Sequence, residues 1–455
     1  MPVFLTMCRS LVVGILCVFA LSLSAQVPAS RATVLPPLPN PEWLAQLIQS
    51  SPVLRQHTVG VCLADAATGQ QVFGLNEDRY FTPASTMKLF SLYAGLHLLP
   101  DSLPSLHYIV RPDTLLFWGT GDPTLLHGDV PSARAFNFLL HRPEKLVYAP
   151  VPCVNAYGPG WTWDDYNYYF QPERGPFPIY GHTVRFYARA GQPTPRVVPQ
   201  FFKPLTQPAP AGLPNPEHDH VHRQELENRF LVFPFTNNWV DETPFRTSSA
   251  LLLQLLQDTL RRPIVPAVLR LRPQDSVRVL RGLAVDSLYR RMLRVSDNFL
   301  AEQLLLMCSS ALRPDSLNTA RVIQVMRRRY LQDLPDAPRW VDGSGLSRLN
   351  LVTPRTLVAL LFKLHQEVPE PRLFDLLAAG GRQGTLRRTT YRDARGPWLW
   401  GKTGTLTNNH NLCGYVRTKS GRIVAFSFMN NNHVAETSTI RKEMERILIQ
   451  VHERL

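Results

Sequence analysis

Residues 81–88, Phe-Thr-Pro-Ala-Ser-Thr-Met-Lys, place a serine and a lysine three positions apart at the start of an expected helix. One proline precedes and another follows this helix, which we predict to run from Ser85 to about Leu98. Side chains three positions apart share a helix face, so the amine of Lys88 can reach the hydroxyl of Ser85. A desolvated lysine can take the proton of a serine hydroxyl, which arginine cannot do. The stretch therefore predicts an activated serine nucleophile.

Two further segments carry residue types suited to the same chemistry. Ser296-Asp297-Asn298 forms a polar break between two expected helices, 284–295 and 299–312, where a hydroxyl and an amide can project into a cleft. The same three residue types also favour a helix N-cap, so a purely structural role is the alternative. Lys402-Thr403-Gly404-Thr405 lies on an expected strand, 398–405, where a glycine permits close approach of another backbone.

The composition makes the lysines of these segments informative. The chain has 455 residues, of which 44% are apolar, and this excludes a disordered or fibrous protein. Only seven of its 49 basic residues are lysines, so arginine is its usual cation. Two of those seven, Lys88 and Lys402, occupy the two positions where the motifs require lysine. Coincidence is therefore a poor explanation for the three segments.

Taken together, S-x-x-K, S-D-N and K-T-G in this order resemble the motif set of penicillin-binding proteins and class A β-lactamases. The serines of the first two motifs are 211 residues apart, more than class A β-lactamases have there. The long gap resembles the class C low-molecular-mass penicillin-binding proteins, the D-alanyl-D-alanine carboxypeptidase/endopeptidase family. Further stretches agree with this resemblance, which covers about Val53 to Asn432: Phe81–Ser85, Gly119–Leu125, Gly160–Asp165, Asp342–Ser347 and Gly384–Leu386.

The resemblance implies a role for each motif residue. Ser85 would be the acyl-enzyme nucleophile and Lys88 its general base. Ser296 would relay a proton to the leaving group, and Asn298 would hold the substrate amide. The substrate carboxylate would be bound by the K-T-G strand, through Lys402, Thr403, Gly404 and Thr405. The backbone N–H groups of Ser85 and Thr405 would form the oxyanion hole.

The pattern of elements predicts an α+β fold. Two short β-prone runs, 58–64 and 70–75, form an expected hairpin, and three more, 398–405, 412–418 and 423–428, precede a terminal amphipathic helix. We expect one antiparallel sheet flanked by helices, as in the penicillin-recognising serine transferase fold. The catalytic domain would be discontinuous, 40–100 and 281–455, and residues 101–280 would be a large inserted region between the first two motifs.

The first 25 residues predict export. Arg9 precedes an apolar run, Leu11–Leu23, that ends in small residues, as in a secretory signal peptide. An uncleaved anchor is the alternative, although the run is shorter than a membrane span. We therefore expect a periplasmic protein with at most peripheral membrane association. The four cysteines beyond the leader are irregularly spaced and are expected to be free buried thiols: Cys62, Cys153, Cys308 and Cys413.

The charge of the chain bears on its partners. The net charge is +14, but no run of five basic residues occurs, and we predict no nucleic-acid binding. His218, His220 and His222 alternate and would share one face of an extended segment, which suits zinc or copper. An exposed polar loop is the alternative in this proline-rich stretch. We assign no metal and expect the reaction to need no cofactor.

The leading hypothesis is a serine D-alanyl-D-alanine carboxypeptidase or endopeptidase that acts on peptidoglycan stem peptides through an acyl-enzyme, with β-lactam antibiotics as inhibitors. A serine β-lactamase or esterase on the same fold is the second hypothesis, and it requires a base that activates water for deacylation. The third is a catalytically silent envelope-binding protein, which the three intact motifs disfavour.

Arginine substitution tests the lysine chemistry. Lys88→Arg is expected to abolish acylation, because arginine does not give up its proton to serve as base. Lys402→Arg is expected to keep partial activity with a shifted pH optimum, because Lys402 would lower the pKa of Lys88 by like-charge repulsion. The measurement is D-Ala release from a D-Ala-D-Ala peptide across pH. Substantial turnover by Lys88→Arg would rule out lysine as the base.

Overall fold

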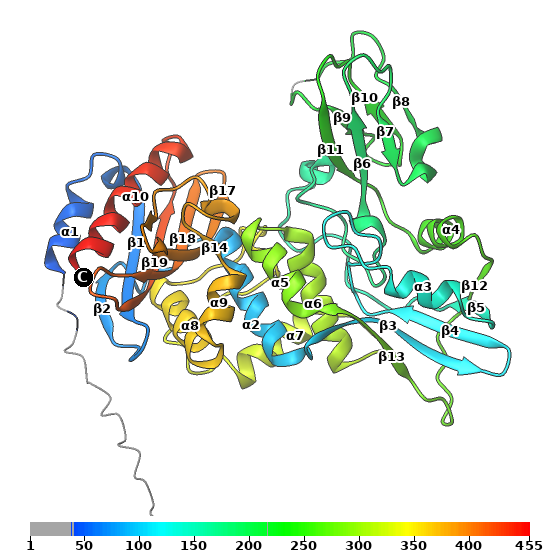
Figure 1. Cartoon of the computed structure of the whole chain (residues 1–455), viewed down its shortest axis with the longest axis horizontal. Helices are drawn as coiled ribbons and strands as arrows, with labels where there is room; N and C mark the ends of the chain where they lie inside the picture. Colours follow the sequence, from blue (N-terminus) through cyan, green and yellow to red (C-terminus); the bar gives the residue numbers. More distant parts are fainter. Residues whose placement is uncertain (1–37, 39–40, 216) are drawn as a thin grey trace, which may run out of the picture. The chain divides into compact units, whose positions relative to one another are not determined.

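The computed structural model describes residues 38, 41–215 and 217–455. A six-stranded antiparallel sheet is built from both ends of this part of the chain, in the order β14-β17-β18-β19-β1-β2 (Figure 1). Its strands are β1 (Thr58–Asp65), β2 (Gln71–Leu75), β14 (Ala378–Ala379), β17 (Leu399–Leu406), β18 (Asn409–Arg417) and β19 (Ile423–Asn431). The predicted hairpin and the predicted α+β class are confirmed.

Helices cover both faces of this sheet. On one face, α1 (Glu42–Gln49) and α10 (Thr437–Arg454) bury their apolar sides, as expected for an amphipathic terminal helix, and Met444, Ile447, Leu448 and Val451 of α10 are all about 1% exposed. On the other face lie α2 (Lys88–Leu98) and α8 (Pro354–Glu367). Because both faces are covered, β18 and β19 are buried along almost their whole length.

A layer of further helices packs against α2. It contains α5 (Val285–Arg294), α6 (Asn298–Leu312), α7 (Thr319–Arg329) and α9 (Glu370–Leu376). Helix α6 is apolar on nearly all sides and is buried from Phe299 to Ser310. It begins directly after Asp297, whose carboxylate accepts a hydrogen bond from the backbone N–H of Leu300 at 3.0 Å. This cap fixes the start of α6, and with it the S-D-N segment.

The segment between the first two motifs forms sheets of its own. A five-stranded sheet has the order β12-β5-β4-β3-β13, and two three-stranded sheets have the orders β8-β10-β9 and β11-β6-β7. The strands that enter and leave the segment, β3 (Ser102–Arg111) and β13 (Arg278–Ala284), pair with each other, so the chain leaves and returns at one place. The remaining elements are β4 (Thr114–Gly119), α3 (Arg134–Leu140), β5 (Lys145–Tyr148), β6 (Thr183–Ala188), β7 (Arg196–Val198), β8 (Thr206–Pro208), β9 (Val221–Arg223), β10 (Phe230–Val232), β11 (Trp239–Pro244), α4 (Ser249–Leu260) and β12 (Ile264–Pro266). A small hairpin, β15 (Arg392–Asp393) and β16 (Gly396–Pro397), precedes β17.

Two local predictions differ from the structure. The helix predicted from Ser85 begins as a 3₁₀ turn, Ala84–Met87, and becomes α-helical only at Lys88, so the serine lies on a tight turn. The strand predicted from Leu412 begins three residues earlier, at Asn409. The polar residues 409–411 are buried there, because neighbouring strands and loops satisfy their side chains: Asn411, for example, donates a hydrogen bond to the carbonyl of Thr82 at 2.9 Å.

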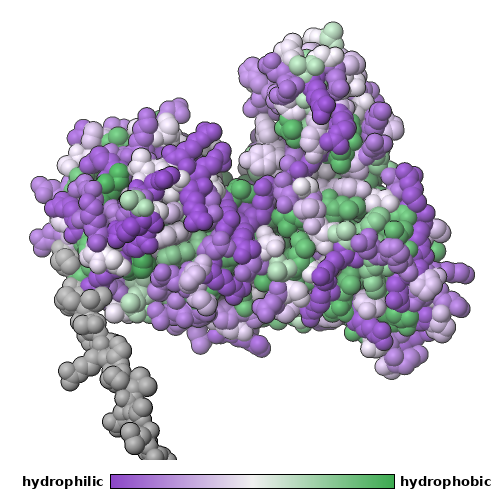
Figure 2. Space-filling view, viewed as in Figure 1, coloured by the Kyte–Doolittle hydropathy of each residue, from purple (hydrophilic) through white to green (hydrophobic). Residues whose placement is uncertain are grey.

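The predicted leader falls outside the described residues. Within residues 38, 41–215 and 217–455, no helix is long and apolar enough to cross a membrane. Hydrophilic residues cover much of the face seen in Figure 2, with apolar residues in separate groups between them. Cys62, Cys153, Cys308 and Cys413 are free thiols, three of them buried and Cys153 half-buried.

Candidate active site

The three motifs meet around two buried lysines. The amine of Lys88 lies 2.8 Å from Ser85 Oγ, 2.6 Å from Asn298 Oδ1 and 2.7 Å from the carbonyl oxygen of Ser344. The amine of Lys402 lies 2.8 Å from Ser296 Oγ. Residues 210 and 106 positions apart in sequence are thus brought within hydrogen-bonding distance, as the motifs predict.

A cleft of about 990 Å³ opens onto these residues. Ser85, Ser296, Asn298 and Thr405 line its wall, so the reacting groups face the solvent side of the site while both lysines are fully buried behind them. Residues of the segment between the first two motifs also line the cleft, among them His127, Asp129, Thr162, Asp164, Asp165, Tyr169 and Phe170.

Two glycines allow the turn that carries Ser85 to pack between its neighbours. A Cβ on Gly404 of β17 would lie 2.5 Å from the carbonyl oxygen of Pro83 and 3.0 Å from the backbone nitrogen of Ser85. A Cβ on Gly345 would lie 1.9 Å from the carbonyl oxygen of Ala84. Both contacts are with backbone, which cannot move aside cheaply, so only glycine fits at either position. The K-T-G strand therefore passes Ser85 at backbone contact distance.

The strand β17 offers a free edge beside Ser85. It pairs with β18 from Leu399 to Leu406, whereas β14 covers its other edge only at Trp400 and Gly401. Residues 402–406 therefore have no strand partner on that edge within the described part of the chain. An extended peptide can pair with such an edge through main-chain hydrogen bonds, which places its backbone next to the serine.

Burial sets the protonation of Lys88. The side chain is fully buried, and the loss of hydration lowers its pKa to about 8, although the carboxylates of Asp342, Asp297 and Glu302 act in the opposite direction. Burial also lowers the pKa of Lys402 well below its ordinary value, and the neighbouring charge of Lys88 lowers it further. About a tenth of a lysine with a pKa near 8 is neutral at pH 7, which is far more than for an exposed lysine.

The S-D-N segment serves both roles that its sequence allows. Asp297 caps α6, while Ser296 and Asn298 on either side of it point to the lysines. Ser296 has a φ of +67°, a left-handed conformation that costs energy for a residue other than glycine. Asn298 Nδ2 also donates a hydrogen bond to the carbonyl of Phe170 at 3.0 Å, which leaves one of its two amide protons free.

The loop Asp342-Gly343-Ser344-Gly345 is shaped by its aspartate. The carboxylate of Asp342 accepts hydrogen bonds from the backbone N–H groups of Gly345 at 2.8 Å and Ser347 at 2.7 Å, and from Trp161 Nε1 at 2.9 Å. The loop thereby presents the carbonyl of Ser344 to Lys88. The family resemblance includes this stretch, but nothing in the sequence indicates that a backbone carbonyl would hold the amine of Lys88.

The polar residues that follow the K-T-G motif, 407–411, include a histidine that holds a side chain of the motif. His410 is buried, and its Nδ1 lies 2.8 Å from Thr405 Oγ1. Burial lowers the pKa of His410 to about 3, so the ring stays neutral beside the motif. Thr403 Oγ1 donates to Thr385 Oγ1 at 2.9 Å. Both threonine hydroxyls of the motif thus have defined partners that fix their side chains.

The alternating histidines lie apart from the cleft and bind different neighbours. His222 contacts Asp219 at 3.1 Å and the Tyr166 hydroxyl at 3.2 Å, and His220 stacks on Trp239. Among the described residues, no group of three histidine, cysteine, aspartate or glutamate side chains is placed to hold a metal ion.

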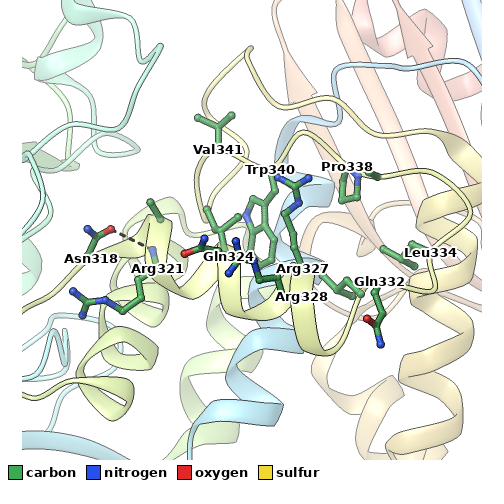
Figure 3. A pocket seen from close by; sticks show the side chains of 14 residues that line it. Asn318, Arg321, Gln324, Arg327, Arg328, Gln332, Leu334, Pro338, Trp340 and Val341 are labelled. Carbon is green, nitrogen blue, oxygen red and sulfur yellow. Dashed lines mark hydrogen bonds between the residues drawn. The ribbon is translucent and has the colours of Figure 1, made fainter.

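A second groove, of about 970 Å³, lies beside α7 (Figure 3). It is lined by Trp340 and by basic residues of the helix, among them Arg321, Arg327 and Arg328. None of the residues of the three motifs lines this groove, so it is distinct from the cleft with the two lysines.

A known family model matches most of this chain. The model of the D-Ala-D-Ala carboxypeptidase 3 (S13) family matches residues 41–200 and 247–451. The chain belongs to this family. The predicted family and the predicted enzyme class, a carboxypeptidase-type hydrolase, are confirmed. The unmatched residues between the two segments hold β8, β9, β10 and β11 of the inserted region.

Curated relatives agree with the family. The chain is 28% identical over 389 residues to carboxypeptidase Rv3627c of Mycobacterium tuberculosis, which covers 81% of this chain and 75% of that protein. It is 34% identical over 150 residues to carboxypeptidase DacB of Mycolicibacterium smegmatis, which covers 31% of this chain and 33% of that protein. The match to D-alanyl-D-alanine carboxypeptidase DacB of Haemophilus influenzae is 28% identical and covers 35% of each chain.

The fold is that of a solved structure. Penicillin binding protein 4 (dacB) from Haemophilus influenzae superimposes with a TM-score of 0.70 at 20% identity, and the match covers 90% of this chain and 99% of that one. The same protein in complex with a β-lactam superimposes with a TM-score of 0.66 at 17% identity. The predicted fold, with its large extra region, is confirmed.

Gly404→Ala tests the contact between β17 and the turn that carries Ser85. The added methyl group is expected to push the strand from the turn and to lower the rate of acylation by a fluorescent penicillin by about 10²-fold, since a displacement of ~1 Å at a reacting centre can cost that much. The melting temperature measured alongside shows whether the variant is folded. A folded Gly404→Ala protein with the wild-type rate would contradict this role of the close approach.

Proposed function

We propose that the protein is a periplasmic serine DD-peptidase that cleaves the terminal D-Ala–D-Ala bond, or a cross-link, of peptidoglycan stem peptides through an acyl-enzyme on Ser85. The observation that carries this proposal is the 2.8 Å contact between Ser85 Oγ and the buried amine of Lys88. A serine hydroxyl becomes an effective nucleophile when a neighbouring base takes its proton. A buried lysine whose pKa is lowered to about 8 supplies such a base near neutral pH.

In the acylation step, Ser85 Oγ attacks the carbonyl carbon of the scissile bond while Lys88 takes the hydroxyl proton. The negative charge that develops on the carbonyl oxygen would be stabilised by the backbone N–H groups of Ser85 and Thr405. The close approach of β17 to the turn supports this arrangement, because the backbone of Gly404 contacts that of Pro83 and Ser85. The carbon–nitrogen bond then breaks and leaves an ester on Ser85.

The departing amine requires a proton. Ser296 Oγ would supply it and recover a proton through Lys402, whose amine is 2.8 Å away. The proton that Lys88 takes from Ser85 would be passed on to this second pair, and so to the leaving D-alanine. Water then hydrolyses the ester, with the same groups acting in reverse, and releases the shortened peptide.

The rest of the site would bind the substrate. Lys402, with Thr403, Gly404 and Thr405 on the same strand, would hold the terminal carboxylate, and the free edge of β17 would align the peptide backbone. The unpaired proton of Asn298 Nδ2 would be donated to a substrate amide carbonyl. A β-lactam would occupy the same place as a substrate mimic, and the β-lactam complex of penicillin binding protein 4 from Haemophilus influenzae supports this part of the proposal.

The test is trapping of the acyl-enzyme. Incubation with penicillin is expected to add one penicilloyl group to the wild-type protein, located on Ser85 by mass spectrometry of peptides. Ser85→Ala is expected to lose both this adduct and D-Ala release from a D-Ala-D-Ala peptide. An adduct on another residue, or none on correctly folded wild-type protein, would overturn the proposal. An adduct that forms on Ser85 and is hydrolysed rapidly, without D-Ala release from the peptide, would favour a β-lactamase instead.

A further inference from the structure

A chain of hydrogen bonds runs from Lys88 through the interior to an arginine of the inserted region. The amine of Lys88 donates to the carbonyl of Ser344 at 2.7 Å, and the backbone N–H of the same serine donates to Glu302 Oε1 at 2.8 Å. The other carboxylate oxygen, Oε2, accepts from Arg174 Nη1 at 2.9 Å. The two peptide groups that flank the Cα of Ser344 are thus each held by one partner, Glu302 on one side and Lys88 on the other, and each oxygen of Glu302 has its own donor.

This chain is buried throughout. The exposed fractions are 0% for Lys88 and Ser344, 1% for Glu302 and 4% for Arg174. Burying charges is costly unless they are paired and hydrogen-bonded, so Glu302 and Arg174 depend on each other. Arg174 is further fixed by a hydrogen bond from its Nε to the carbonyl of Asn155 at 3.0 Å and by its position over the ring of Trp161.

The position of Glu302 on α6 connects it to the site. It lies four residues after Asn298, so the two side chains lie on the same face of the helix, and Asn298 itself contacts Lys88. The next residue, Gln303, holds two loops of the inserted region: its Nε2 donates to the carbonyls of Gly121 at 2.7 Å and of Gly175, next to Arg174, at 2.9 Å. Hydrogen bonds therefore attach the inserted region to the helix that begins at the S-D-N motif.

We propose that Glu302, held by Arg174 of the inserted region, is a positioning residue that fixes the Ser344 carbonyl and thereby the amine of Lys88. The inference rests on the proposed role of Lys88 as the general base. It assigns to the inserted region a part in building the catalytic geometry, since Arg174 belongs to a segment that contributes no residue to the three motifs.

The charges around Lys88 predict a change in the pH dependence of acylation that a loss of packing alone would not produce. The charges of three neighbouring carboxylates, Asp342, Asp297 and Glu302, each raise the pKa of Lys88, and Lys402 is the cation close enough to interact with it. Removal of the charge of Glu302 therefore lowers the pKa of Lys88 further. The acid limb of the pH–rate profile for acylation moves to lower pH, because Lys88 then loses its proton at a lower pH.

The experiment compares Glu302→Gln with wild type in acylation by a fluorescent penicillin across pH. Gln keeps the shape of the side chain and removes the charge. We expect the maximal acylation rate to fall by at least about tenfold, because small misplacements of a reacting group cost up to ~10²-fold, and the acid limb to shift to lower pH. Asp275→Asn is the matched control: Asp275, in the loop before β13, pairs with Arg111 of β3 at 2.9 Å, neither residue lines the cleft, and the substitution should change neither the acylation rate nor the acid limb.

A second variant separates positioning from stability. Glu302→Gln leaves Arg174 buried without a counter-charge and can destabilise the protein, whereas Glu302→Gln combined with Arg174→Met removes both charges. We expect the double variant to recover the melting temperature but not the acylation rate. Wild-type rate and pH profile in either folded variant would overturn the inference. A wild-type protein that is not acylated would instead overturn the proposed function on which it rests.

Discussion

The burial of the Lys88 amine is the constraint on which the rest of the site depends. A lysine with no solvent exposure must find its partners inside the protein, and Lys88 finds three oxygen atoms at 2.6–2.8 Å, those of Ser85, Asn298 and Ser344. These partners come from three different segments of the chain. The same burial lowers the pKa of Lys88 to about 8, so that about a tenth of this lysine is neutral at pH 7. Placement and reactivity thus follow from one physical cause.

The fold supplies this burial by bringing distant segments together. Segments from both ends of the described part of the chain form one sheet, and this places the K-T-G strand beside the turn that carries Ser85. The helical layer brings the start of α6 to the same point. At Gly345 and Gly404 the neighbouring backbone packs so tightly against the turn that carries Ser85 that there is no room for a side chain at either position. The long insertion leaves and returns through the paired strands β3 and β13, so it does not interrupt this assembly.

The sequence predicted the residues with distinctive chemistry and missed those that act through the backbone. Ser85, Lys88, Ser296, Asn298 and Lys402 meet as their motifs predict, because side-chain chemistry at fixed spacing is visible in sequence. The Ser344 carbonyl is invisible in this way, since every residue has a carbonyl. Glu302 and Arg174 lie in an apolar helix and in a loop of the insertion, and only the tertiary structure shows that they are buried against each other. The early start of β18 was missed for a related reason: Asn409–Asn411 are polar, yet buried partners satisfy them.

The central claim, that Lys88 is a buried base with a lowered pKa, can be tested directly because the chain has only seven lysines. Labelling with ¹³C at the lysine ε-carbon gives few NMR signals, and Lys88→Arg and Lys402→Arg identify the two motif lysines by the loss of one signal each. The account predicts that the Lys88 signal titrates near pH 8 in the free enzyme, well below the ordinary value of 10.5. A Lys88 signal that titrates at 10.5 or above would contradict it.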